Sequence, residues 1–363
     1  MKKQIGAKNG LWQKIVAFGA SSTALNIVVK LSIVLGILAV LLLSFSFIPS
    51  KKVTEQNVIL DSFNKVSSSS KLKHNTLIMA EKGGYIQNPA NTRKAFDAVI
   101  KSSSYTDIVE LDIRTSKDGI LVVFDDETIN SAALKEGEEA VYIRDKTAEE
   151  LKKYNLGNNF VSLENKKPYE GIYSYATQGL SMLTFQEFVE RYVSSRSSVH
   201  YIVDIKETKE AGRNAVDKAV EILKAEAYDK FRTRVIFSSE DESVKNHVVN
   251  NYPDYMVCGN GSYVDSVVSL NTLGLRLFSN PNYELIQLEV NNPALLGIKF
   301  NTLNKQFIKK LEARNMAIIY TGISTEEQIR SIYENGGHIV GTGYPKLVDT
   351  TIQAIEKELK ENA

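Results

Sequence analysis

The chain has 363 residues and a single cysteine, Cys258. An intramolecular disulfide is therefore impossible, and a metal site built from several cysteines is excluded. This composition suits a bacterial surface protein better than an extracytoplasmic animal domain, which would usually carry disulfides.

Acidic residues are absent from the first fifty positions, which carry five lysines. The remaining residues hold 39 basic and 43 acidic side chains, so the body of the protein is mildly acidic. No basic surface suited to nucleic acid is expected from such a balance, and nucleic acid is not predicted as a partner. The apolar content of 43% and charged content of 24% are typical of a globular protein.

Charged residues are also absent from Leu31–Pro49, a run of 19 residues. At a rise of about 1.5 Å per residue, a helix of this length covers a hydrocarbon core about 30 Å thick. A cleaved signal peptide is the alternative, but the leader is long, the apolar run exceeds the usual length, and no small-x-small site follows it. We therefore predict one uncleaved transmembrane helix.

Lysines dominate the residues before this span, and only Lys51 and Lys52 directly follow it. The positive-inside rule then places the N-terminus in the cytoplasm and the rest of the chain outside the membrane. The predicted location is a bacterial cell membrane, crossed once. Residues 11–29 are too polar for a second span and are expected at the membrane interface.

The predicted organisation has four parts. Residues 1–50 form the basic leader and anchor, and residues 51–75 form a polar linker with a four-serine run. Residues 76–350 form the main domain, and residues 351–363 a C-terminal helix or tail.

Short apolar runs alternate with amphipathic stretches through the main domain, which indicates parallel strands joined by helices. Eight strands of this kind favour a closed (β/α)8 TIM barrel over an open doubly wound sheet. The predicted strands are Leu77–Ala80, Ile108–Ile113, Tyr201–Ile205, Val235–Phe237, Tyr255–Cys258, Leu285–Val290, Ala317–Tyr320 and His338–Val340. No glycine-rich nucleotide-binding motif follows the first strand.

Leu121–Phe124 lies too close to the preceding strand for a parallel crossover, which needs a dozen or more residues. An Asp118-Gly119 turn separates the two, so a hairpin arm at the barrel mouth is predicted. The tyrosine-rich residues 128–183 are predicted to be an insertion over the mouth, with a helix near Thr147–Tyr154.

Charged residues recur where the predicted strands end, and these ends meet at the mouth of a TIM barrel. Several carboxylates at one mouth are typical of a Ca²⁺ or Mg²⁺ site, and neighbouring lysines can hold phosphate oxygens. The alternative for Glu110 and Asp112, which share one strand face, is a solvated sheet edge. The residues concerned are Glu81, Lys82, Glu110, Asp112, Asp204 and Lys206, with Asp125, Asp126 and Glu127 on the hairpin.

The order and spacing of several short motifs resemble the glycerophosphodiester phosphodiesterase family, whose fold is a TIM barrel of the phospholipase-C-like phosphodiesterase type. The resemblance covers roughly residues 77–348. Its A-H-R-G, E-L-D-V, V-V-F-H-D and E-I-K motifs match Ala80-Glu81-Lys82-Gly83, Glu110-Leu111-Asp112-Ile113, Val122-Val123-Phe124-Asp125-Asp126 and Asp204-Ile205-Lys206. Its E-N-P-x-N-T, W-T-V-N and T-D-x-P motifs resemble the runs Gln87–Thr92, Tyr320–Ile323 and Thr342–Pro345.

The resemblance implies that a divalent cation, Ca²⁺ or Mg²⁺, is held by Glu110, Asp112 and Asp204. The family's acid–base pair consists of two histidines, and their positions are taken here by Glu81 and Asp125. The motif arginine is replaced by Lys82, which loses the bidentate grip on phosphate. Substrate contacts are implied for Lys82, Lys206 and Tyr320.

None of the four histidines replaces the missing pair. His74 lies in the linker, His247 lies in a helical pattern, and His200 and His338 begin strands at the wrong end of the barrel. A carboxyl group is a poor proton donor at neutral pH unless its surroundings raise its pKa.

Two functions follow. The first is a membrane-anchored, extracytoplasmic binding module, without hydrolysis or with impaired hydrolysis, for a cation and a polyol-phosphate or wall-polymer ligand. The second is a divergent metal-dependent phosphodiesterase or phosphotransferase acting on glycerophosphodiesters or teichoic-acid-like polymers, in which Glu81 and Asp125 serve as acid and base or as ligands of a second metal.

Overall fold

Eight parallel strands close into a barrel in the part of the chain that the structure describes, with β1 paired to both β11 and β2. The protein is represented by a computed structural model that describes residues 22–45, 52–53, 56–64, 76–101, 105–193, 199–225, 228–272, 282–290, 294–295, 298–299 and 301–362. The barrel strands are β1 (Leu77–Ala80), β2 (Ile108–Thr115), β4 (His200–Ile205), β5 (Val235–Ser239), β6 (Met256–Gly259), β7 (Leu285–Glu289), β10 (Ala317–Thr321) and β11 (Ile339–Thr342). The predicted TIM barrel and all eight predicted strands are confirmed.

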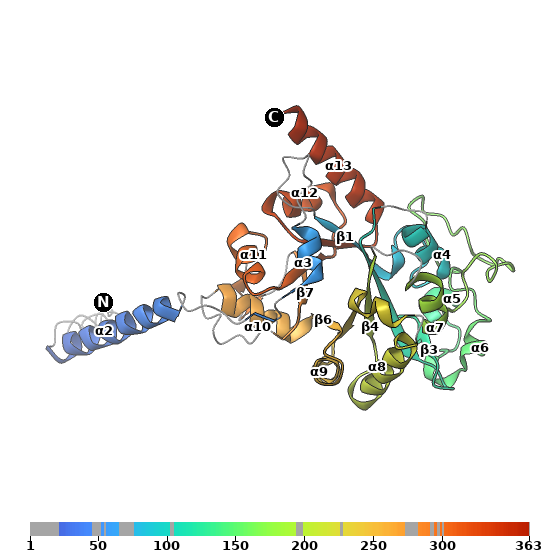
Figure 1. Ribbon diagram of the computed structural model, residues 1–363, viewed down its shortest axis with the longest axis horizontal. Coiled ribbons are helices and arrows are strands. Elements are labelled where there is room, and N and C mark those ends of the chain that lie inside the picture. Colours follow the sequence, from blue (N-terminus) through green and yellow to red (C-terminus); the bar gives the residue numbers. More distant parts are fainter. Residues whose placement is uncertain are drawn as a thin grey trace, which may run out of the picture.

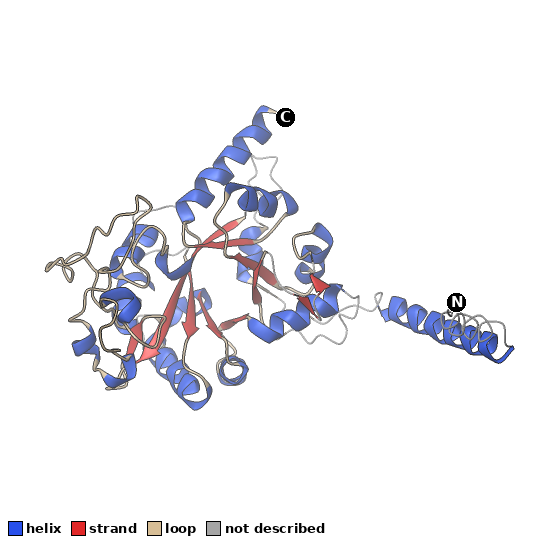
Figure 2. Cartoon of the chain, turned by 180° about the vertical axis from the view of Figure 1, so that it is seen from behind, coloured by secondary structure: helices blue, strands red, loops and turns tan. Residues whose placement is uncertain are grey.

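A helical segment follows each barrel strand and covers its outer face (Figure 2). Two of these segments join a short α-helix to a π-helical turn: α4 (Arg93–Phe96) with η2 (Asp97–Lys101), and α7 (Phe185–Phe188) with η4 (Val189–Val193). The others are α8 (Lys209–Leu223), α9 (Glu242–Asn251), α10 (Gly261–Thr272), α11 (Lys305–Glu312), α12 (Glu326–Asn335) and α13 (Pro345–Glu361). The predicted boundary at residue 350 falls inside α13, whose buried Val348 and Ile355 make it a barrel helix rather than a tail.

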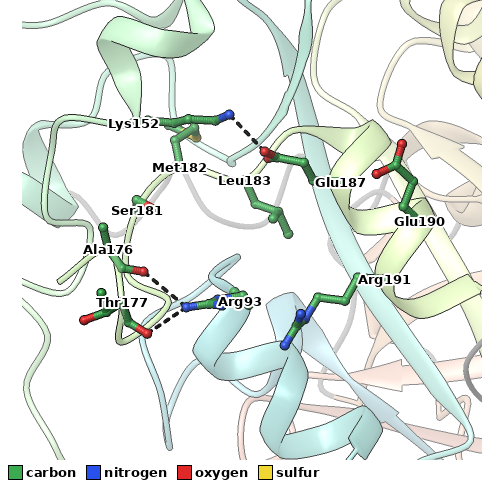
Figure 3. A pocket seen from close by; sticks show the side chains of 10 residues that line it. All are labelled: Arg93, Lys152, Ala176, Thr177, Ser181, Met182, Leu183, Glu187, Glu190 and Arg191. Atoms are coloured by element: carbon green, nitrogen blue, oxygen red, sulfur yellow. Dashed lines mark hydrogen bonds and ion pairs between the residues drawn. The ribbon is translucent and has the colours of Figure 1, made fainter. Parts of the chain in front are cut away.

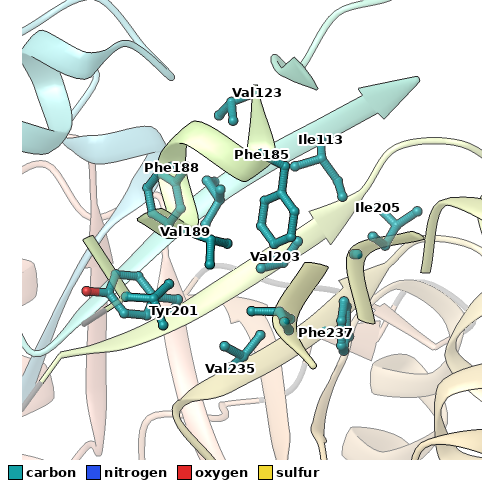
Figure 4. Close-up of a cluster of buried hydrophobic side chains, with 14 of the residues drawn as sticks. Ile113, Val123, Phe185, Phe188, Val189, Tyr201, Val203, Ile205, Val235 and Phe237 are labelled. Carbon is teal, nitrogen blue, oxygen red and sulfur yellow. The ribbon is translucent and has the colours of Figure 1, made fainter. Parts of the chain in front are cut away.

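Strand alternation separates two apolar layers. Inward residues such as Ile108 and Ile202 fill the barrel interior. Outward residues such as Val203 pack against the covering helices, where Phe185 and Phe188 of α7 lie over β2 and β4 (Figure 4). Glu110 and Asp112 have the inward parity of Ile108, and for this reason they point into the barrel.

The lower end of the barrel, where the strands begin, is closed by a short helix, α3 (Val58–Phe63). Ile59, Leu60 and Phe63 are buried in the same cluster as the inward strand residues. Asn57 caps this helix and donates to the carbonyls of Glu284 and Asn315 at 3.0 and 2.9 Å. This part of the predicted linker is therefore a plug and not a free tether, because its apolar face has the barrel interior to cover.

The predicted hairpin is confirmed: β3 (Leu121–Val123) pairs antiparallel with the end of β2. The insertion after it lies on one flank of the barrel (Figure 1). Its regular elements are α5 (Asn130–Ala133), η3 (Ile143–Asp145) and α6 (Ala148–Leu151), the last within the predicted Thr147–Tyr154 helix. Its own core packs Ile129, Ile143 and Leu151 against Val122 and Phe124 of the hairpin arm.

The remaining described elements are α2 (Ser22–Phe45), η1 (Glu81–Gly83), η5 (Asp229–Arg234) and a two-stranded sheet of β8 (Ala294–Leu295) and β9 (Ile298–Lys299). Within the described ranges, no helix has both the length and the apolar character needed to cross a membrane. Residues 46–49, the end of the predicted span, lie outside those ranges, as do most of the leader and His74. The transmembrane helix stays a prediction.

Candidate functional site

The turn after β1 is built to present two charged side chains. Lys82, Gly83 and Gly84 have positive φ values of 50°, 76° and 87° in succession. A side chain at Gly83 would come within 2.9 Å of Phe96, so only glycine fits there. Lys82 holds the left-handed conformation at a cost, which is characteristic of functional turns.

Strand register brings the predicted metal ligands together. Asp112 of β2 lies directly beside Asp204 of β4, and Glu110 lies two residues earlier on β2. Neighbouring strands are about 4.8 Å apart, so these carboxylates share one part of the barrel mouth. All three are buried and line a cavity of about 460 Å³ together with Glu81, Lys82 and Lys206.

Few hydrogen bonds satisfy these acids. Asp112 accepts a hydrogen bond of 2.7 Å from the Asn91 side chain, whose own oxygen accepts from the Asp112 backbone N–H at 3.3 Å. Asp204 Oδ1 is buried without a hydrogen-bond partner. The Glu110 carboxylate is 7% exposed, and Asp112 and Asp204 are among the negative charges near it.

Two lysines converge on Asp125, which directly follows the hairpin arm at residue 124. Lys82 pairs with Asp125 Oδ2, and the Lys206 ammonium lies 2.8 Å from Asp125 Oδ1. The same ammonium lies 3.2 Å from Asp204 and 3.5 Å from Asp112. Lys206 is thus the cation at the centre of three carboxylates.

Burial is the main cause of the raised pKa values of three carboxyl groups in the mouth. Desolvation raises the pKa of Glu81 to about 7 and that of Asp112 to about 6, with repulsion from nearby carboxylates adding to both. Desolvation and the charge of Asp112 raise the pKa of Glu110 well above its usual range.

Asp125 behaves in the opposite way. Desolvation acts to raise its pKa, but hydrogen bonds from Lys206 and Lys82 outweigh it and hold the pKa below its usual value. Desolvation likewise acts to lower the pKa of Lys206, but the charges of Asp204 and Asp112 outweigh it and raise that pKa. At neutral pH the Asp125 carboxylate is therefore negatively charged, and the Lys82 and Lys206 ammonium groups beside it are positively charged.

The donor set has the chemistry that a divalent cation requires. Glu110, Asp112 and Asp204 offer hard oxygen ligands, and Asp204 Oδ1 is a buried acceptor that nothing satisfies. In the described part of the chain, however, no three such side chains lie ready to hold a metal ion. Lys206 lies among the same carboxylates, so a bound cation would require this ammonium to move aside.

One predicted site residue, Tyr320, does not lie at the mouth. Tyr320 is fully buried among the covering helices, and its hydroxyl donates to the Thr302 carbonyl at 3.0 Å. It has the outward parity on β10, and the next residue, Thr321, lines the mouth in its place. The prediction that Tyr320 contacts substrate is therefore corrected.

The three described histidines lie away from the mouth. His338 is buried at the lower end against Phe63, and its Nδ1 accepts from the Ile318 backbone N–H at 3.0 Å. His200 begins β4, and burial lowers its pKa to about 4. His247 of α9 lies 2.6 Å from Asp217, on the outside of the barrel.

Sequence reasoning missed several residues of the mouth. Asn91 lies in the motif run Gln87–Thr92, which does not by itself predict that its side chain bonds to Asp112. The ends of later barrel strands also meet at the mouth, and this could have been used to find more of its residues. The structure places four further polar residues there: Glu240, Asn260, Gln287 and Glu289.

A larger cavity, of about 820 Å³, lies on the flank between α4, α7 and the insertion (Figure 3). Its basic groups already have partners. Arg93 donates to the carbonyls of Ala176 and Thr177, and Lys152 pairs with Glu187 at 2.9 Å. The barrel mouth, with its buried and unsatisfied acids, is the better candidate site.

Fold and site together define a (β/α)8 barrel with an acidic mouth that carries two lysines. The chain belongs to the glycerophosphoryl diester phosphodiesterase family, whose model matches residues 82–347. It is 38% identical over 85 residues to a glycerophosphodiester phosphodiesterase of Caldanaerobacter subterraneus subsp. tengcongensis, a match covering 23% of this chain and 32% of that protein. A Bacillus altitudinis glycerophosphodiester phosphodiesterase is 30% identical over 131 residues, or 36% of this chain and 45% of that protein. The chain thus spans less than half the length of these curated relatives.

Solved structures share the fold. The glycerophosphoryl diester phosphodiesterase domain of a Mycobacterium tuberculosis protein has a TM-score of 0.59 at 15% identity, covering 77% of this chain and 99% of that one. An Oleispira antarctica phosphodiesterase in complex with the product sn-glycerol-3-phosphate has a TM-score of 0.55 at 17% identity, covering 76% and 96%.

Proposed function

We propose that this protein is a membrane-anchored, extracytoplasmic barrel that binds a divalent cation and a polyol-phosphate ligand and has lost most or all hydrolytic activity. The observation that carries this proposal is the state of Asp125. It stands where the family has a histidine, yet two lysines hold it ionised. A carboxylate held in this way cannot take up and release a proton near pH 7.

The cation would be held by Glu110, Asp112 and Asp204, in keeping with the general cation dependence of the family. When bound, the ion would neutralise the carboxylates and offer a positive charge to phosphate oxygens. Lys82 and Lys206 would supply the remaining positive charge for the phosphate, as point charges rather than bidentate donors.

The ligand class follows from the family and from one neighbour. The Oleispira antarctica structure contains sn-glycerol-3-phosphate. For this chain we propose a glycerophosphodiester or a teichoic-acid-like wall polymer, both of which carry polyol groups on phosphate.

Binding is tested on the full chain in detergent, by thermal unfolding with Ca²⁺, Mg²⁺ or EDTA and with added glycerophosphodiester. We expect either cation to raise the unfolding temperature of the native protein, and the diester to raise it further. Asp112→Ala should remove both effects, whereas Glu139→Gln, a charge loss on an exposed acid of the insertion that does not line the mouth, should keep them. Absence of any cation effect on the native protein would refute the cation site.

A second function is favoured by Glu81. Its pKa of about 7 is suited to general acid–base chemistry, and it stands at the other histidine position. In a divergent phosphodiesterase or phosphotransferase, Glu81 would exchange the proton. Cation-dependent turnover that Glu81→Gln abolishes would establish this alternative.

A further inference from the structure

Asp125 is held at both ends of its carboxylate. Oδ2 pairs with Lys82, from the turn after β1, and Oδ1 lies 2.8 Å from Lys206, after β4. Arg114 fixes the backbone at this point, because its Nε donates to the Asp125 carbonyl at 2.6 Å. One anionic group therefore bridges two cations that come from the ends of two different strands.

This bridging geometry is the one that a phosphate group would adopt. Two oxygens on one central atom each accept from a separate ammonium group, and such charge-assisted hydrogen bonds are about twice as strong as neutral ones. Any oxyanion that binds to the two lysines must therefore displace the Asp125 carboxylate or share the cations with it.

The Lys82–Asp125 pair also stands between two cavities. Lys82 and Lys206 line the mouth cavity of about 460 Å³. Lys82 and Asp125 line a second cavity of about 210 Å³, with Tyr85, Ser131, Ala132 and Leu156 among its walls. Ser131, Ala132 and Leu156 come from the insertion, so the insertion builds the far wall of the side cavity.

The lining of the side cavity is mixed. Leu156 and Ala132 offer apolar surface, whereas Ser131 and Asp126 offer oxygens and are joined by a hydrogen bond of 2.6 Å. A polyol arm has both C–H and O–H groups and matches such a lining. Inorganic phosphate has no such arm and would leave the cavity unfilled.

From these contacts we infer that Asp125 is a built-in competitor for the anion site, and that the ligand is a phosphodiester with a polar arm on each side. Its phosphate displaces the Asp125 carboxylate from Lys82 and Lys206. One arm then lies in the barrel mouth and the other in the side cavity formed with the insertion. This inference rests on the proposed function, since it specifies the ligand of the same site.

The test is calorimetric titration of the full chain in detergent with EDTA, so that no divalent cation contributes. Three probes are compared: inorganic phosphate, dimethyl phosphate and bis(glycerol) phosphate. Asp125→Asn should bind all three at least tenfold more tightly than the native protein, which corresponds to about 1.4 kcal/mol. Lys82→Gln added to Asp125→Asn should remove that gain. The control Glu139→Gln, which removes the charge of an exposed acid of the insertion that lines neither cavity, should not produce it.

The side cavity is tested in the Asp125→Asn background with Ala132→Phe, which fills it. This change should weaken bis(glycerol) phosphate at least tenfold and leave inorganic phosphate and dimethyl phosphate unaffected. Asp125→Ser removes the same charge and serves if Asp125→Asn does not fold.

Two results would overturn the inference: unchanged or weaker anion binding by both Asp125 variants, or an equal effect of Ala132→Phe on all three probes. The proposed function fails separately, through the absence of cation-dependent stabilisation in the native protein.

Discussion

Glu81 and Asp125, the two acids that the motif match aligns with the family's histidines, have opposite properties. Glu81 is about nine-tenths buried, so desolvation favours its neutral form and its pKa rises to about 7. Asp125 is more exposed and lies against two ammonium groups, so its charged form is favoured. Of these two residues, only Glu81 can exchange protons at neutral pH, and one such residue does not replace an acid–base pair.

The buried acids should make the protein less stable as pH rises. Their pKa values are raised in the folded state, so the unfolded chain loses these protons first and folding stability falls from about pH 4 upward. For Asp112 and Glu81 this loss is complete above about pH 6 and pH 7, and the raised pKa of Glu110 acts in the same direction. We expect the unfolding temperature in EDTA to fall between pH 5 and pH 8.

Glu110→Gln isolates the contribution of one of these acids, because glutamine cannot ionise. The variant should unfold at a higher temperature than the native protein at pH 8 and should show a weaker pH dependence. Glu289→Gln, an exposed acid of the same mouth, should do neither. A lower unfolding temperature for Glu110→Gln at pH 8 would contradict this account.

Asn91 orients Asp112 through two hydrogen bonds. Removing them with Asn91→Ala leaves a buried carboxylate with fewer donors, which should lower the free energy of unfolding by about 1–3 kcal/mol in urea. Asn88→Ala, on the same loop and only partly buried, is the control. If the two variants lose equal amounts of unfolding free energy, the hydrogen bonds between Asn91 and Asp112 do not stabilise the fold in the way described.

Among the secondary-structure elements, the barrel strands were predicted well because each is a short apolar run, as expected for a strand that is buried on both faces. Their predicted ends lie close to those observed, and the hairpin followed from the short Asp118-Gly119 connection. The plug helix α3 was missed because six residues in a polar setting carry too little periodicity to signal a helix. Contacts with the distant ends of β7 and β10 stabilise it, and sequence alone does not show them.

The plug should contribute to the stability of the barrel. Phe63 is buried in the interior cluster and contacts the His338 ring edge-on at 4.7 Å between centroids. Phe63→Ala should lower the free energy of unfolding by about 3–5 kcal/mol, measured in urea. Asp61→Asn, on the exposed face of α3, should change it little. Equal stability of the two variants would show that α3 does not close the barrel.

At the scale of the whole molecule, the chain enters the barrel from below. The Val53 N–H donates to the Arg314 carbonyl at 3.1 Å, and Asn57 bonds to the residues just before β7 and β10. An anchor at Leu31–Pro49 would therefore attach to the end of the barrel opposite the mouth.

The anchor itself is tested by fractionation. The native chain should stay with the membrane during carbonate extraction, and its mature N-terminus should lie before Leu31. A chain that begins at residue 52, with α3 intact, should be released. A mature protein that begins after Pro49 would show a cleaved signal peptide instead.

Much of the candidate site followed from sequence, because strand parity and strand ends place Glu110, Asp112, Asp204 and Lys206 at one mouth. The prediction for Tyr320 was wrong because it came from a motif match alone. In the alternation of β10 its side chain faces the covering helices and not the barrel interior. The pairing of Asp125 with two lysines could not be foreseen, since it depends on how three separate loops meet.

The central claim is that a phosphodiester binds to this mouth without being hydrolysed. It is tested most directly by turnover of a glycerophosphodiester by the full chain with Ca²⁺, Mg²⁺ or Mn²⁺, alongside Asp112→Ala and the double variant Glu81→His with Asp125→His. We expect the native protein to show no more turnover than Asp112→Ala, and the double variant to gain cation-dependent turnover. Cation-dependent turnover by the native protein that Asp112→Ala abolishes would contradict the claim.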